Sequence, residues 1–64
     1  MLAEAWRSED QLFRWHATGA VAWLDANEQA CPDHGARVWA QVLSLAEGRE
    51  EILADVLRLF GRDR

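Results

Sequence analysis

The stretch VWAQVLSLAEGREEILADVLRLFG, residues 38–61, keeps one apolar register across the charged interruption 47–51. Alternating steps of four and three place Val38, Val42, Leu45, Arg49, Ile52, Val56 and Leu59 in one row. A second row repeats every seven residues, at Trp39, Ala46, Leu53 and Phe60. Rows at this spacing lie on one side of a helix. The pattern therefore predicts one helix over residues 33–60, with Gly61 as its C-cap.

Gly48 is the weak point of this predicted helix. Glycine costs about 1 kcal/mol relative to alanine in a helix interior, and this penalty is too small to end a helix by itself. A break near Gly48 is the alternative, and it would divide the second helix in two. Arg49 stands where the row calls for an apolar residue, so we expect its charged end to reach solvent or a carboxylate such as Glu28.

A first helix is predicted over residues 8–28. Ser8 and Gln11 have the spacing of a capping box, in which the serine hydroxyl accepts from the backbone amide three residues on. The small residues Ala17, Gly19 and Ala20 lie at mid-length of this helix, and we expect them to allow close approach of another helix, because their side chains are small or absent. Pro32 disfavours helix at Cys31 and suits the first position of the next helix. The turn is therefore predicted over residues 29–33.

Two helices joined by a short turn make an antiparallel helical hairpin, so the predicted fold class is all-α, with one domain over residues 1–64. A chain of 64 residues buries only about 60% of its extended surface. Half of its residues are hydrophobic, four are tryptophan, and its single cysteine forms no internal disulfide. We therefore expect two hairpins to dimerise into a four-helix bundle. The alternative is a three-helix bundle with a break near Gly48.

The expected oligomer interface lies on the second helix. Leu43 and Leu57 are outside the main row and widen its apolar side, which indicates contact with more than one neighbour. The predicted interface consists of Trp39, Val42, Leu43, Ile52, Leu53, Val56, Leu57 and Phe60.

The charge balance narrows the classes of partner. Seven arginines, no lysine and eleven carboxylates give a formal net charge of −4. Phosphate backbones repel an acidic chain, which argues against nucleic acid as a partner. No apolar run approaches the roughly 20 residues that cross a bilayer, and the first residues lack the pattern of a signal peptide. We therefore expect a cytoplasmic protein without membrane contact.

A group of carboxylates marks the candidate partner-binding surface. Glu47, Glu51 and Asp55 follow one another at steps of four, with Glu50 beside them. On a continuous helix they would lie about 6 Å apart along the axis. Phosphates on a nucleic-acid strand have similar spacing, so this row would fit a basic groove on another protein. The alternative interpretation is an ordinary solvated helix face.

Residues with reactive side chains are few. Cys31 and His34 lie close in sequence, and His16 lies on the first helix. A closed zinc site needs four ligands, and a bundle this small leaves little room for a substrate cavity. We therefore predict no enzyme activity and no catalytic, metal-binding or cofactor-binding residues.

Two short segments resemble the Rop family of plasmid copy-number regulators. They are LDANEQA, residues 24–30, and RLFGRD, residues 58–63. Members of this family are short helical hairpins that dimerise into a four-helix bundle and bind paired RNA loops. The resemblance implies the same architecture here. Rop-like proteins bind RNA with lysines and polar residues of the first helix, whereas this helix has no lysine and its arginines are outnumbered by carboxylates.

These observations favour a small acidic, non-enzymatic protein-interaction module. It would inhibit or regulate a partner protein with a basic or apolar surface, for example a nucleic-acid-handling enzyme, as the anti-CRISPR and anti-restriction proteins of mobile elements do. One alternative is a Rop-like RNA-binding regulatory dimer. Another is a structural subunit of a larger complex, with tryptophans as contact anchors.

Overall fold

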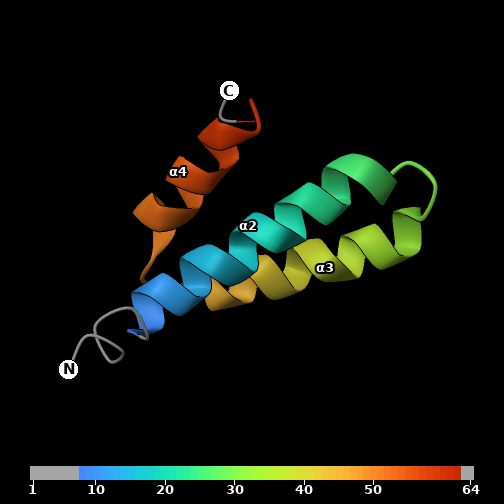
Figure 1. The fold of residues 1–64 in the computed structure, drawn as a ribbon. Helices are drawn as coiled ribbons and strands as arrows, with labels where there is room; N and C mark the ends of the chain where they lie inside the picture. Colours follow the sequence, from blue (N-terminus) through green and yellow to red (C-terminus); the bar gives the residue numbers. More distant parts are fainter. Residues whose placement is uncertain (1–7, 63–64) are drawn as a thin grey trace.

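The computed structural model describes residues 8–62, which form three helices and no strand (Figure 1). Helix α2 spans Glu9–Asn27, α3 spans Pro32–Leu45 and α4 spans Glu50–Leu59. The predicted all-α class is confirmed, and the described residues make a small helical bundle. Residues 1–7 and 63–64 of the predicted domain lie outside the described part.

Local capping signals place both ends of α2 and the start of α3 close to where the sequence predicts. The Ser8 hydroxyl accepts from the Gln11 amide over 3.2 Å at the start of α2. Helix α2 ends at Asn27, whose side-chain amide donates to the Trp23 carbonyl over 3.0 Å. Helix α3 then begins directly at Pro32. Because proline lacks an N–H, it loses nothing at a position where that group has no intrahelical partner.

The second predicted helix is divided, so the prediction of one helix over residues 33–60 is wrong. Helix α3 ends at Leu45, and Gly48 has φ +80°, a left-handed conformation that favours glycine. The Arg49 amide donates to the Ala46 carbonyl over 2.7 Å and closes the turn. The Gly48 amide donates to the Glu50 carboxylate over 3.1 Å. The alternative, a break near Gly48, is what the chain adopts.

The turn at Gly48 sends α4 back along α2. Helix α4 begins beside the start of α2 and runs in the same direction, so α2 is the central helix with α3 and α4 packed along it (Figure 1). Residues of α3 and α4, on the two sides of the turn, pack against apolar residues of α2 in one core. That core consists of Phe13, Ala17, Val21, Val42, Ala46, Leu53 and Val56.

Close approach of two helices occurs at Gly35 and not at Gly19. A Cβ on Gly35 would lie 3.5 Å from Leu24 Cδ2 and 3.5 Å from Glu28 Cβ, so glycine lets the start of α3 pack on the end of α2. Gly19 is exposed, and a Cβ there would meet nothing within 4 Å. Of the small residues expected to allow close approach, Ala17 is fully buried and Ala20 packs against the core, whereas Gly19 has no close neighbour within the chain.

Gly61 ends α4 as predicted. It has φ +70°, and its amide donates to the Arg58 carbonyl over 3.1 Å, while the Arg62 amide donates to the Leu57 carbonyl over 2.9 Å. This pair of bonds is the Schellman arrangement that satisfies the last carbonyls of a helix. It also turns Arg62 back toward α2.

Candidate interaction surface

Most of the predicted oligomer-interface residues are used inside one chain. Val42, Leu53 and Val56 are buried in the core. Ile52 and Leu57 are half-buried and pack against it. Side chains covered in this way offer little contact area to a second chain, because they already pack in the core of their own chain.

The other three members of that predicted interface differ in exposure. Phe60 is half-buried against the core. Trp39 is also half-buried, and the Arg62 guanidinium carbon lies 5.3 Å from the centroid of its indole ring. Leu43 alone of the eight is exposed, at 56%. An oligomer interface at these residues stays a prediction, and Leu43 is the member with most surface to contribute.

The four predicted partner-binding carboxylates do not form one row on a helix. Glu47 lies in the turn, whereas Glu51 and Asp55 belong to α4. Asp55 pairs with Arg58 over 2.6 Å and with Arg14 of α2 over 3.6 Å. The row is therefore interrupted where the helix ends, and Asp55 forms an ion pair between α4 and α2.

Glu50 also has a local structural role. Its carboxylate accepts from its own backbone amide and from that of Gly48, and these two bonds lower the pKa of Glu50. Glu47 and Glu51 are exposed and make no ion pair within residues 8–62. These two carboxylates are the members of the predicted surface that remain open to a partner.

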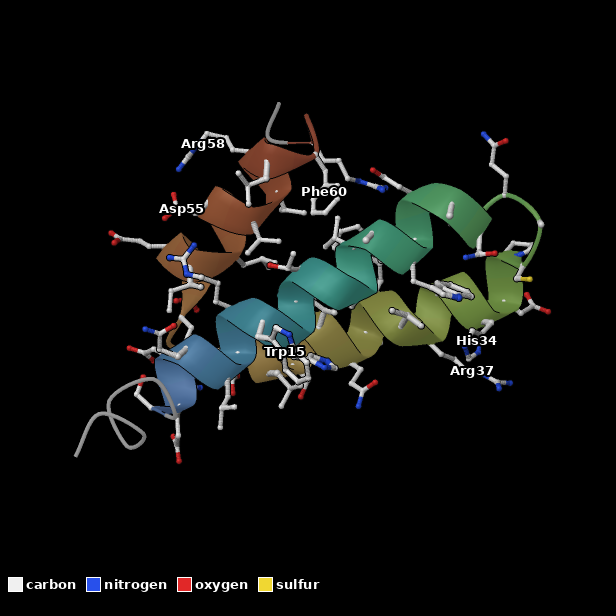
Figure 2. The ribbon with its side chains drawn as sticks, in the orientation of Figure 1. Trp15, His34, Arg37, Asp55, Arg58 and Phe60 are labelled. Atoms are coloured by element: carbon white, nitrogen blue, oxygen red, sulfur yellow. The ribbon has the colours of Figure 1, made fainter. Side chains whose placement is uncertain are left out.

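A different surface is open along α2. Leu12, Trp15, Gly19, Ala22 and Ala26 follow alternating steps of three and four and are all exposed. These five residues are called the α2 seam below. Trp15 is 77% exposed, and Figure 2 shows it on the α2–α3 pair. The spacing of this seam is present in the sequence, but spacing alone does not show which side chains of α2 the other helices cover.

A groove of about 430 Å³ lies between α2 and α3 beside the seam. His34 of α3 stands edge-on to Trp23, with ring centroids 5.0 Å apart and an interplanar angle of 80°. The groove is lined by Trp15, His16, Gly19, Ala20, Trp23, His34, Val38 and Gln41, none of which carries a carboxylate.

A second groove of about 340 Å³ extends the same face toward the start of α2. It shares His16 with the first groove and is lined by Leu12 and Leu45, both large, apolar and exposed. Its charged members, Glu9 and Arg49, pair with each other over 2.9 Å. The seam and the two grooves together form the open α2–α3 face.

The arginines of the described residues are mostly paired. Arg49 binds Glu9 and Asp10 at the start of α2, and Arg62 binds Asp25 and Glu28 near its end. The hydrogen bond that Arg62 donates to the Glu28 carboxylate raises the pKa of Arg62. Arg49 was expected to reach solvent or a carboxylate such as Glu28; it does bind carboxylates, but the turn brings it to Glu9 and Asp10 at the opposite end of α2. Within residues 8–62, Arg37 is the arginine that makes no ion pair.

The candidate metal-binding and nucleophilic residues do not form a cluster. Cys31 is exposed at the start of α3, His34 packs on Trp23, and His16 lies between the two grooves. Among the described residues, no group of three or more His, Cys, Asp or Glu side chains is placed to hold a metal ion.

Comparisons with known proteins found no match, so functional inference for this chain rests on the surfaces described above. No helix among residues 8–62 is long and apolar enough to cross a membrane. The chain matches no protein-family model, no curated protein and no solved structure.

Proposed function

We propose that this chain is a non-enzymatic protein-interaction module that inhibits or regulates a partner protein by occupying part of its surface. The open α2–α3 face carries the proposal. Trp15 is 77% exposed on this face, although the chain buries Leu24, Val42 and Val56 completely. Exposed contiguous apolar surface on a small protein is typical of a contact site.

The composition of the face fits protein recognition. Tryptophan is enriched among the residues that contribute most to binding, because it buries a large apolar area with few rotatable bonds. Trp15 stands beside a groove that would receive a side chain of the partner. Leu12 and Leu45 extend the apolar contact, and the Glu9–Arg49 pair supplies a polar rim at one end.

The acidic surface is the second candidate within the same proposal. Glu47 and Glu51 are exposed near the turn at Gly48, and a basic groove of a nucleic-acid-handling enzyme would attract them. This version corresponds to the anti-CRISPR and anti-restriction class. The carboxylates of Glu50 and Asp55 already have internal partners, Gly48 for the first and Arg58 and Arg14 for the second, which reduces their capacity to bind a partner.

The Rop-like alternative has less support. RNA binding needs cations that can neutralise phosphates. Four of the five arginines in the described part of the chain already pair with carboxylates of the same chain. A structural subunit of a larger complex would use the same open face. This second alternative differs from the proposal only in what binding does, which is assembly and not inhibition or regulation of the partner.

Matched variants distinguish the two candidate surfaces. A tagged full-length chain is used to capture proteins from extracts of its native host, alongside Leu12→Ser/Trp15→Ser and Glu47→Lys/Glu51→Lys variants. Leu59→Ser is the control, because Leu59 is 72% exposed on α4. We expect the seam variant to lose a specific partner that the control retains.

Each result decides one point. Loss of the partner only in the charge-reversed variant would replace the apolar face by the acidic surface. Equal capture by all variants would end the proposal for both surfaces.

A further inference from the structure

The α2 seam has a gradient of side-chain size. Its large members, Leu12 and Trp15, lie in the first half of α2, and its small members, Gly19, Ala22 and Ala26, lie in the second half. Trp15 projects from the surface, whereas an added Cβ at Gly19 would meet nothing within 4 Å. A projection and an open site therefore stand one helical turn apart on one exposed line.

Such a line is complementary to itself in one orientation. If two copies of α2 pack antiparallel around a two-fold axis midway between Trp15 and Gly19, each Trp15 meets the other copy's Gly19. The same axis sets each Leu12 against the other copy's Ala22, so both of these contacts join a large residue to a small one. A parallel pairing would oppose Trp15 to Trp15 and leave a gap at Gly19. Contact of one surface with itself is the arrangement found in two-fold dimers.

The charge distribution permits this contact. Two chains of net charge −4 repel each other, so a dimer has to form through a face without unpaired carboxylates. No member of the seam is charged, and the neighbours His16 and Thr18 carry no carboxylate. Glu9 and Asp25, near the two ends of the seam, are already paired with arginines of their own chain.

A specific dimer sets a minimum for the area that the face has to supply. Such an interface needs about 1,000 Å² in total, or about 500 Å² from each chain. That share is close to a tenth of the 4864 Å² surface of the protein. One tryptophan supplies about 150–250 Å² when fully buried, and Leu12, Leu45 and the adjoining groove residues add to it.

We infer that a second copy of this chain occupies the open α2–α3 face, with Trp15 of each chain packed over Gly19 of the other. The inference rests on the proposed function in so far as both assign a contact role to this face. It adds a form of regulation, because the dimer covers the surface that would bind the partner. The second copy and the partner then compete, and dilution of the protein releases the binding-competent monomer.

Sedimentation equilibrium of the full-length chain tests the inference, over concentrations from about 5 to about 500 µM. We expect the wild-type mass to rise from 7.3 kDa toward twice that value. Trp15→Ala removes the projection, and Gly19→Leu fills the open site; each should weaken dimerisation about tenfold or more. The exchange Trp15→Gly/Gly19→Trp should restore dimerisation to within about threefold of wild type, because the axis relates these two positions.

The control and the folding check use the same chain. Leu59→Ser removes a different exposed leucine and should leave the dimer unchanged. Circular dichroism verifies that each variant is helical, and if Gly19→Leu does not fold, Trp15→Ala decides, since this side chain makes little contact within its own chain.

Several outcomes would overturn the inference. They are a wild-type chain that stays at 7.3 kDa throughout, a Trp15→Ala variant that dimerises like wild type, or an exchange variant that is no better than Gly19→Leu. A monomeric wild-type chain that still captures its partner through the α2–α3 face overturns the dimer alone. A dimer that matches the predicted variant pattern but captures no partner leaves the inference standing and removes the proposed function.

Discussion

Arg49 Nε donates to Asp10 Oδ1 over 3.0 Å, so the residue that precedes α4 is bound to the first turn of α2. The same guanidinium also donates to Glu9 over 2.9 Å. At the other end of α4, Arg62 binds Glu28 over 2.8 Å and also contacts Asp25. Helix α4 is therefore fastened to α2 at both ends, and its apolar side is held over the core between them.

The first prediction concerns this contact at the start of α4. Arg49 is 27% exposed, but its partners are far more exposed, so solvent screening limits the interaction to about 0.5–1 kcal/mol. Arg49→Met should lower the free energy of unfolding by that amount, and the loss should shrink at high salt. Urea denaturation at two ionic strengths measures it, with Arg37→Met as the unpaired control. A double-mutant cycle with Asp10→Asn that gives no coupling would contradict the assignment.

The second prediction uses one substitution at two glycines. Gly19 lies in α2 with nothing within 4 Å of an added Cβ, so Gly19→Ala should stabilise the fold by about 1 kcal/mol. Gly48 has φ +80°, and Gly48→Ala should destabilise it by about 1–2 kcal/mol, because a side chain is strained in that conformation. Thermal melts at a concentration where the chain is monomeric compare the two. Effects of the same sign would contradict the break at Gly48.

The third prediction concerns pH. Bonds from its own amide and from Gly48 lower the pKa of Glu50 in the folded chain, so its ionised form favours folding. This contribution is fully present above the unfolded pKa of about 4.3 and is lost as the pH falls through the lower folded value. Thermal unfolding is measured at a series of pH values for wild type and Glu50→Gln. The difference between their melting temperatures should be constant near neutral pH and vanish in acid. Glu47→Gln should show a smaller difference, because the Glu47 carboxylate makes no hydrogen bond or ion pair with the described residues.

Local signals made most element boundaries predictable from the sequence. The Ser8 cap, the start at Pro32 and the end at Gly61 each depend on residues within one helical turn, and each lies where the sequence predicts. The break at Gly48 was not predictable from periodicity. Apolar spacing is the same whether the helix continues or folds back, because both halves pack their apolar side chains into the same core.

The candidate site depended more strongly on tertiary structure. The carboxylate row presupposed a continuous helix, so it lost its geometry when Glu47 entered a turn. The sequence does not show which of Gly19 and Gly35 allows close helix packing. Gly35 has close neighbours only because the start of α3 packs on the end of α2. The exposure of Trp15 likewise follows from the side of α2 on which α4 packs, which no local pattern records.

The last prediction concerns the shape of the Arg62 side chain. Its guanidinium bonds to Asp25 and Glu28 of α2 and lies 5.3 Å from the Trp39 ring centroid of α3, so it joins the end of α4 to both other helices. A lysine keeps the charge but not the planar fork that binds two carboxylates while lying over a ring. Arg62→Met should lower the free energy of unfolding by about 1 kcal/mol. Arg62→Lys should lower it by most of that amount. Amide hydrogen exchange should show the loss first in the last turn of α4, and full rescue by lysine would show that charge alone is sufficient there.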